Sequence, residues 1–316
     1  MTKKRIDIPE WIRGRLALGD DLARARKAVE ARGLNSICVS AACPNRGECW
    51  QKKHVTFMIL GDRCTRGCRF CNVENSSPLP PDPEEPFKVT EAVEELGAEY
   101  IVLTSVTRDD LPDGGCGQFV RTVNEIKKRL PHVKVELLIP DFKADPEILS
   151  EIVSCGADVI GHNIEMPEAL YKALRPEADY ARSLEVLRLL KDLAPDLPRK
   201  SSVMVGLGEG EEDLVRTFRD LAVSGVDILY IGQYLSPTAS HYPVKRYYTP
   251  RRFEELKELA LGMGFPVVCS APMQRQELQI SISKQKILFL LKNMHGIKAS
   301  KAQWNIFTQQ KSSSKK

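Results

Sequence analysis

The sequence lacks any apolar run long enough to cross a bilayer, which takes about 20 residues. Its first residues, MTKKRIDIPEWIRGRLALGDD, lack the apolar core of a secretory signal peptide, and their early acidic residues are unlike a transit peptide. We therefore expect no membrane association and a cytoplasmic protein. In a reducing cytosol, clustered cysteines are more often metal ligands or catalytic groups than disulfide partners.

Acidic residues are also scarce in one part of the chain. Residues 273–316 contain nine Lys and Arg and one acid, Glu277, whereas residues 1–272 contain 37 basic and 41 acidic residues. The net charge of +4 therefore comes from the tail, and the body is mildly acidic. A nucleic-acid-binding protein would carry a basic face on its folded body. We expect no nucleic-acid partner and a solvated tail.

Apolar segments and helical patterns alternate along most of the 316 residues. The segments predicted as buried strands lie at 55–61, 98–106, 133–140, 157–165, 199–208, 226–234 and 265–270. Residues 7–35 also have a helical composition. Alternating strands and helices predict an α/β fold with a parallel sheet. Six or so strands favour a partial (β/α) barrel over a full barrel or a doubly wound sheet.

We divide the chain into an N-terminal helical and loop extension (1–53), a barrel (54–272) and an atypical C-terminal tail (273–316). In either parallel architecture, the active site lies at the carboxyl ends of the strands. Polar segments follow the predicted strands there: GDRC, TSVTRDD, HNIE, GLGEGEED and GQYLSPT. We expect the functional site at this edge of the sheet.

Six of the nine cysteines form two triplets. They are Cys38, Cys43 and Cys49, spaced C-x4-C-x5-C, and Cys64, Cys68 and Cys71, spaced C-x3-C-x2-C. The first triplet shares its segment with Pro44 and Gly47, so we expect no regular structure there. Zinc prefers four ligands, and three thiols suit it poorly. Three thiolates can instead hold an iron–sulfur cluster and leave one iron open to another ligand.

The second triplet, with Phe70 before its last cysteine, resembles the motif of the radical S-adenosylmethionine superfamily. The resemblance implies a partial barrel and a [4Fe–4S] cluster whose open iron is chelated by S-adenosylmethionine. One electron from the cluster then cleaves the sulfonium and gives a 5′-deoxyadenosyl radical. The cofactor carries out the difficult chemistry, and the protein orients it and excludes water.

The first triplet, fifteen residues before the second, resembles that of lipoyl synthases, as do CPNRGECW, SVTRDDLPDGG, HNIE, VMVGLGE and GQYL. The resemblance covers about residues 6–272. It implies a second [4Fe–4S] cluster that is consumed as two sulfurs enter C6 and C8 of a protein-bound octanoyl chain. An unactivated methylene offers nothing to acid–base or nucleophilic catalysis, so a radical is required. Two hydrogens are removed, which implies two S-adenosylmethionines per product.

The same resemblance implies partners. The octanoyl group is carried by a lipoyl carrier domain or by the glycine cleavage H protein. An electron donor such as ferredoxin or flavodoxin reduces the cluster. Two other functions stay open: a biotin-synthase-like sulfur inserter and a non-catalytic electron carrier, which would need four cysteines per cluster. A structural zinc protein is a further alternative.

Several residues outside the triplets are candidates for binding S-adenosylmethionine. By resemblance, Asn163 and Glu165 of HNIE contact it, although polar side chains at a strand end also satisfy backbone groups. Arg175 could pair with the cofactor carboxylate or form a surface salt bridge.

Two loops complete the candidate site. Residues Gly206, Gly208 and Glu209 follow a predicted strand, where glycines either approach a nucleotide or make a plain turn. A loop crowded with charged residues follows another predicted strand, at 98–106. It contains Arg108, Asp109, Asp110 and Asp113. Cys116, Cys155 and Cys269 are interpreted as structural.

The tail departs from the family pattern. In lipoyl synthases an Arg-Ser-Ser-Tyr segment follows the last strand, and its serine caps the open iron of the sulfur-donating cluster. Aligned through SAP, Arg275 matches, but Gln276, Glu277 and Leu278 replace Ser-Ser-Tyr. The iron could be capped by Glu277 or a tail serine (Ser281 or Ser283), could bind solvent, or the chain could be inactive. We favour solvent and impaired turnover, because a ligand must be placed accurately to bind a metal.

Overall fold

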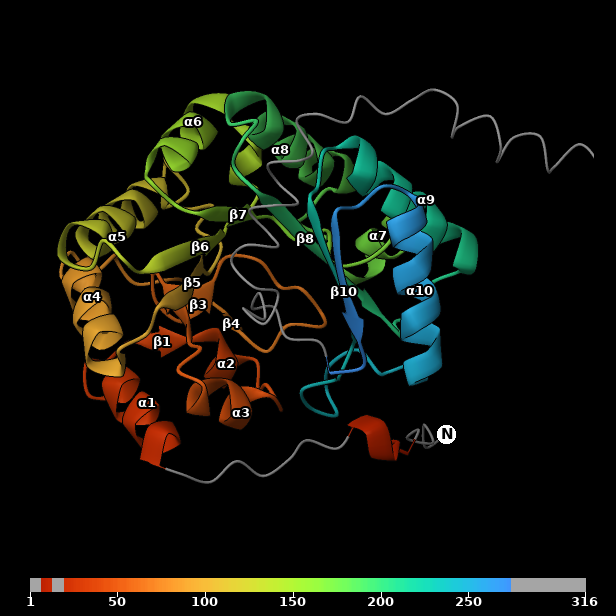
Figure 1. Ribbon diagram of the computed structural model, residues 1–316, viewed down its shortest axis with the longest axis horizontal. Helices are drawn as coiled ribbons and strands as arrows, with labels where there is room; N and C mark the ends of the chain where they lie inside the picture. The colour runs from red at the N-terminus through yellow and green to blue at the C-terminus, as the bar shows by residue number, and fades with distance from the viewer. Residues whose placement is uncertain (1–6, 13–19, 274–316) are drawn as a thin grey trace, which may run out of the picture. The chain divides into compact units, whose positions relative to one another are not determined.

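A computed structural model describes residues 7–12 and 20–273 of the chain. Its main sheet has eight strands (Figure 1). They are β1 (Asn35–Ser36), β2 (Thr56–Ile59), β5 (Tyr100–Ser105), β6 (Lys134–Leu138), β7 (Val159–Gly161), β8 (Arg199–Val205), β9 (Ile228–Gln233) and β10 (Val267–Ala271). A separate small sheet pairs β3 (Arg63–Cys64) with β4 (Glu74–Asn75). All seven strand predictions are confirmed, and β1 is an addition.

The strand order establishes a partial barrel. The sheet runs β1-β2-β5-β6-β7-β8-β9-β10, and every neighbouring pair is parallel except β1 with β2. A doubly wound sheet would reverse its strand order in the middle, and this sheet never does. The second-choice prediction of a doubly wound fold is therefore wrong, and the partial barrel is confirmed.

Helices connect successive strands and lie along the outer side of the sheet (Figure 1). The connecting helices are α4 (Glu85–Leu96), α5 (Cys116–Arg129), α6 (Pro146–Ser154), α7 (Tyr171–Leu174), α8 (Tyr180–Leu193), α9 (Glu211–Val223) and α10 (Pro250–Gly262). Several begin where a side chain accepts from the first free N–H groups, as Asp145 does for α6 and Asp179 for α8. Gly97 ends α4 in the left-handed conformation.

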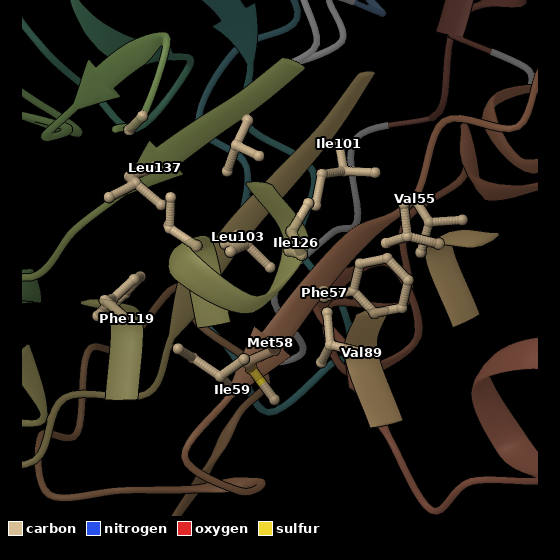
Figure 2. Close-up of a cluster of buried hydrophobic side chains, with 14 of the residues drawn as sticks. Val55, Phe57, Met58, Ile59, Val89, Ile101, Leu103, Phe119, Ile126 and Leu137 are labelled. Atoms are coloured by element: carbon tan, nitrogen blue, oxygen red, sulfur yellow. The ribbon is translucent and has the colours of Figure 1, made fainter. Parts of the chain in front are cut away.

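The apolar core lies between the sheet and these helices. Figure 2 shows Phe57 and Ile101 of the sheet among side chains from the helices, including Val89 of α4 and Ile126 of α5. Alternate residues of a strand point to opposite faces. Residues such as Ile101 and Val135 pack against helices, so their neighbours face the barrel interior.

The interior face carries a buried polar layer toward the amino ends of the strands. Lys200 pairs with Glu136, and the Tyr100 hydroxyl donates to the same carboxylate. The Lys200 ammonium also lies 4.4 Å from the centre of the Tyr230 ring. All four side chains are at most 8% exposed. These four side chains occupy the barrel interior at this level of the sheet.

The N-terminal region is more ordered than its sequence suggests. A single 3₁₀ turn spans Glu10–Ile12, and α1 spans Asp20–Glu30, which confirms the predicted helical stretch over α1, whereas a turn and β1 follow it. The prediction that the first cysteine segment has no regular structure is wrong. Two short helices form there, α2 (Ile37–Ser40) and α3 (Arg46–Gln51), because Ser36 caps α2 and the buried Trp50 packs α3 into the core. No helix in the described part of the chain could span a membrane.

Candidate functional site

The second cysteine triplet lies in the loop that follows β2, at the carboxyl edge of the sheet. Cys64 ends β3, and its Sγ accepts from the backbone N–H of Thr107, at 3.3 Å, and of Arg66, at 3.5 Å. Cys68 and Cys71 are joined by a backbone hydrogen bond of 3.0 Å from Cys71 N to Cys68 O. The His241 ring lies 3.1 Å from the carbonyl oxygen of Cys71.

The three thiols of this triplet influence one another. Burial raises the pKa of Cys68, and the neighbouring Cys64 adds to the effect while Arg175 opposes it. Burial also raises the pKa of Cys71 to about 11, with smaller contributions from Cys68 and Cys64. Thiols that affect each other's charge in this way lie near one another. A metal that binds them must displace their protons.

Arg175 and Glu165 lie near these thiols. The Arg175 guanidinium hydrogen-bonds to Cys68, and Glu165 influences the pKa of that thiol. Glu165 in turn accepts a hydrogen bond from Asn163, and burial raises its pKa. Three predicted cofactor contacts therefore lie beside the cysteine loop, and their roles toward the cofactor stay a prediction.

The backbone at Glu165 is unusual. Its φ of 66° lies in the left-handed region, which is rare for a residue other than glycine, asparagine or aspartate. Hydrogen bonds hold it on both sides, from Glu165 N to Ser202 O at 3.0 Å and from Met204 N to Glu165 O at 2.8 Å. Such strain is typical of functional sites, where the surrounding structure enforces it.

The donor set suits an iron–sulfur cluster with a bound amino acid group. Arg175 donates from Nη1 to the Tyr171 hydroxyl at 3.0 Å, yet its buried Nε has no hydrogen-bond partner among the described residues. A buried donor normally has a partner. An incoming carboxylate would satisfy it, because guanidinium and carboxylate groups match in shape and charge.

The first triplet lies on the two short helices before β2. Cys38 is on α2 and Cys49 is on α3, and both are buried. Cys43 lies between the helices, and its N–H donates to Cys38 O at 3.1 Å. The left-handed Ala42, with a φ of 48°, turns the chain back just before Cys43. This turn and the backbone bond keep the segment around Cys43 against α2.

The loops of the two triplets are in direct contact. The Asn72 side chain, next to Cys71, donates to Ser40 O of α2 at 2.6 Å. On the other side, the Asn45 side chain donates to Met273 O at 3.3 Å, just beyond β10. The first triplet therefore lies between the second triplet and the point where the C-terminal tail begins. The rest of that tail, including Gln276, Glu277, Leu278, Ser281 and Ser283, lies outside the described residues.

The glycine loop after β8 has a packing role of its own. Glu209 accepts from the N–H groups of Gly206, at 2.7 Å, and Leu207, at 2.8 Å, and so closes the turn. A Cβ on Gly206 would lie 2.4 Å from Arg246 O. Gly206 and Gly208 both have left-handed φ values, of 96° and 104°. A plain turn accounts for all three residues, and their proximity to a cofactor stays a prediction.

The charged residues of the loop after β5 have different partners and different roles. Arg108 is buried and forms two hydrogen bonds to Asp110, of 2.9 and 2.8 Å. Asp113 accepts from Gly115 N and Gly117 N, both at 2.9 Å, and thereby starts α5. These contacts are structural. Only Asp109 reaches the cysteine loop, where it binds Arg66.

Sequence reasoning missed Arg66, Asp141 and Arg182. They form one ion-pair network beside the second triplet. The only sequence signal for this network was Arg66, a charged residue between two cysteines of the motif. Its partners come from distant loops, so periodicity and spacing could not identify them.

A zinc site would need its ligands gathered around one ion within the described ranges, 7–12 and 20–273. No three Cys, His, Asp or Glu side chains there lie close enough together to hold a single metal ion. Zinc requires its thiolates about 2.3 Å from one centre, whereas a cluster presents separate irons to its thiolates. Of the other cysteines, Cys116 and Cys155 are buried and Cys269 is partly exposed.

Sequence comparison gives a consistent result. Residues 58–221 match the radical SAM superfamily. Lipoyl synthase of Alkaliphilus metalliredigens is 46% identical over 88% of this chain and 96% of its own length. That of Rubrobacter xylanophilus is 48% identical over 84% of this chain and 83% of its own length. The mitochondrial lipoyl synthase of Vitis vinifera is 44% identical over 86% and 72%.

Solved structures share the fold at low sequence identity. Methylornithine synthase (PylB) superposes with a TM-score of 0.51 and 15% identity, covering 92% of this chain and 93% of the other. HydG, a maturase of the [FeFe]-hydrogenase, gives 0.55 and 15%, covering 68% and 51%. These likenesses concern the fold alone.

Proposed function

Because this chain belongs to the lipoyl synthase family of the radical SAM superfamily, we propose that it forms the lipoyl group, by inserting two sulfur atoms at C6 and C8 of a protein-bound octanoyl chain. The observation that carries the proposal is the contact between the two triplet loops, through Asn72 and Ser40. Sulfur insertion needs the sulfur within bonding distance of the activated carbon. Two adjacent clusters meet that need.

The cysteines divide between the two [4Fe–4S] clusters that this family uses. In our proposal, Cys64, Cys68 and Cys71 hold the cluster that S-adenosylmethionine joins, and the other triplet (Cys38, Cys43 and Cys49) holds the cluster that supplies sulfur. When bound, the first cluster and S-adenosylmethionine together supply the radical that removes hydrogen from an unactivated carbon. The protein residues bind, orient and shield these groups.

The residues around the second triplet would position S-adenosylmethionine. The free Nε of Arg175 is available to its carboxylate, while Arg175 Nη1 stays bound to Tyr171. Glu165 and Asn163 supply an acceptor and an amide for its amino group. Gly206, Gly208 and Glu209 stand at the next strand end and would border its remaining part. The strained backbone of Glu165 keeps its carboxylate at the pocket wall.

The substrate and the electron come from other proteins. Lipoyl synthases act on octanoylated carrier proteins, and radical SAM enzymes need an electron donor. For this chain we propose a lipoyl carrier domain or the glycine cleavage H protein as carrier, and ferredoxin or flavodoxin as donor. We propose a cytoplasmic location, where clustered cysteines are kept reduced.

The direct test is reconstitution of the chain with iron and sulfide without oxygen, followed by reaction with S-adenosylmethionine and an octanoylated carrier peptide. Mass spectrometry should show addition of two sulfurs to the peptide, with about two S-adenosylmethionines cleaved per lipoyl group, one for each hydrogen removed. A monothiolated intermediate should accumulate when S-adenosylmethionine is limiting.

Two results would overturn the proposal. Sulfur transfer to dethiobiotin in place of the octanoyl peptide would favour the biotin-synthase-like function. Reversible electron transfer by the reconstituted protein, with no cleavage of S-adenosylmethionine, would favour an electron carrier.

A further inference from the structure

Arg66 lies inside the second cysteine motif, between Cys64 and Cys68, and its side chain is 7% exposed. Its guanidinium forms two hydrogen bonds to Asp109, of 2.7 and 2.8 Å, and two to Asp141, of 2.7 and 2.9 Å. Both carboxylates are therefore held by both of their oxygens. This is the bidentate geometry in which charge-assisted hydrogen bonds are strongest.

The two carboxylates come from different strand ends. Asp109 follows β5, and the Thr65 hydroxyl donates to it at 3.2 Å. Asp141 follows β6, is 3% exposed, and also accepts from Arg182 Nε of α8 at 3.0 Å. Two arginines and two aspartates balance one another in charge. The network joins the cysteine loop to two loops of the barrel mouth and to a helix.

The turn after Asp141 is strained. Phe142, Lys143 and Ala144 have φ values of 40°, 55° and 57°, in the left-handed region that non-glycine residues avoid. Such residues are unfavourable unless their surroundings enforce the conformation. The Asp141 carboxylate accepts from Lys143 N at 3.1 Å within this turn. The structure thus maintains an unfavourable turn at the place that presents Asp141 to Arg66.

The rest of the cysteine loop is held by other hydrogen bonds. Its second half is held through the backbone, from Arg69 N to Leu174 O at 2.9 Å and from Tyr242 N to Arg69 O at 3.0 Å. Its first half follows β3, where Thr65 bonds to Thr107 O through its N–H, at 3.1 Å, and its hydroxyl, at 3.0 Å, and Arg66 adds the charged attachment to two further loops. Burial lowers the pKa of Arg66, but its hydrogen bonds to Asp109 and Asp141 raise it overall.

We propose that Arg66 is a positioning residue, which fixes the spacing of Cys64 and Cys68 before any cluster is bound. This inference rests on the proposed function, because it assumes that these cysteines hold the radical SAM cluster. An exposed ion pair would contribute little. Removing one partner of a buried pair leaves uncompensated charge and is strongly disruptive. Without Arg66, Asp109 and Asp141 would repel each other, and the loop would open.

The test measures the loop before and after iron is added. In iron-free protein under anaerobic, reducing conditions, iodoacetamide labelling of each cysteine is followed by peptide mass spectrometry. We expect Arg66→Gln to raise the labelling rates of Cys64 and Cys68 roughly tenfold or more, because both thiols are only partly exposed and opening of the loop would expose them fully. After reconstitution, it should bind less iron at this triplet and give an altered or lost electron paramagnetic resonance signal.

Matched variants separate positioning from general damage. Arg69 lies in the same loop with an exposed side chain, so Arg69→Gln changes the same charge without touching the network. Arg182→Gln removes a cation from Asp141 but leaves Arg66 bound to both carboxylates. Arg69→Gln should label and bind iron like the unaltered chain, and Arg182→Gln, whose arginine is 30% exposed, should change both much less than Arg66→Gln does. Arg66→Lys keeps the charge but loses the planar guanidinium that binds two oxygens of a carboxylate at once. Its labelling rates and iron content should therefore fall between those of Arg66→Gln and the unaltered chain.

Three results decide the matter. If Arg66→Gln labels, binds iron and gives the same spectrum as the unaltered chain, the inference is wrong. If Arg66→Gln does not fold, the same labelling is measured on Asp109→Asn, which weakens only the ion pair between Arg66 and Asp109. Unchanged labelling of Cys64 and Cys68 in that variant also overturns the inference. If the unaltered chain itself binds no iron at this triplet, the proposed function fails instead.

Discussion

Cys68 and Cys43 belong to different triplets, and single substitutions can separate the roles of their clusters. Cys68→Ala should abolish reductive cleavage of S-adenosylmethionine, because the cluster that donates the electron is lost. Cys43→Ala should leave cleavage measurable and stop sulfur insertion. Chromatography of 5′-deoxyadenosine and mass spectrometry of the peptide check the two activities. Equal loss of cleavage in both variants would contradict the assignment of two clusters.

His162 is a buried residue whose charge state should affect stability. Its Nδ1 lies 3.0 Å from Ile139 O, and its Nε2 has no partner among the described residues. Burial lowers its pKa from 6.5 to about 4, against the opposing effect of the hydrogen bond to Ile139. The unfolded chain therefore binds more protons between these two values, so the stability that His162 contributes falls as the pH drops from about 6.5 to about 4.

Urea unfolding of the iron-free protein at several pH values checks this prediction. The slope attributable to His162 should reach about 1.4 kcal/mol per pH unit. His162→Gln should remove that part of the pH dependence, whereas His132→Gln, at an exposed position, should not. An identical pH profile for His162→Gln and the unaltered chain would contradict the prediction, because it would mean that folding does not lower the pKa of His162.

Sequence reasoning works well at this scale where ligand type and spacing are local. The six cysteines and the motif around Glu165 could be proposed in that way, and their roles stay a prediction. The network of Arg66 could not, because its partners lie 43 and 75 residues away along the chain. Nor could the turn chemistry of Glu209, whose carboxylate closes its own loop. Such roles depend on which strand ends meet, and that is known only after folding.

At the scale of elements, the strands and their order were predictable because apolar runs and helical patterns alternate regularly. Short pieces were not. β1 has two residues and pairs only because Ser36 stands opposite Phe57 at the sheet edge. α2 and α3 have four and six residues, too few for a periodic pattern. Their stability comes from packing and capping, which spacing does not reveal.

The polar layer inside the barrel gives a prediction for the sheet. Lys200→Met should leave Glu136 buried without its cation and destabilise the protein by about 3–5 kcal/mol. Glu136→Gln with Lys200→Met should cost much less than the sum of the single changes, because no charge remains and the new amide could still accept from Tyr100. Urea unfolding of the four proteins measures the coupling. Additive effects would show that the pair contributes nothing as a pair.

At the scale of the whole molecule, the barrel is predicted to be one of three parts, with the N-terminal extension at 1–53 and the tail at 273–316. Met273, at the start of the tail, contacts Asn45 of the first triplet segment. We expect the tail to govern the sulfur-donating cluster, since the chain after Met273 departs from the family there. Gln276, Glu277 and Leu278 stand in place of its Ser-Ser-Tyr.

Rebuilding that segment tests the expectation. Gln276→Ser, Glu277→Ser and Leu278→Tyr, with truncation after residue 278, should raise lipoyl formation about 10- to 100-fold, the range associated with losing support for a metal ligand. Mass spectrometry of the carrier peptide at saturating S-adenosylmethionine measures the change. The control keeps the natural residues and is truncated at the same place. Equal product from the natural tail and the rebuilt one would show that no defect exists.

The buried layer of Tyr100, Glu136, Lys200 and Tyr230 has a consequence for the order of events in catalysis. It occupies the barrel interior toward the amino ends of the strands, while both cysteine loops lie toward the carboxyl ends. Small molecules must then enter and leave the barrel at the same end. We expect the carrier protein and S-adenosylmethionine to share that opening, so exchange of the cofactor between the two sulfur insertions should limit the rate of the cycle.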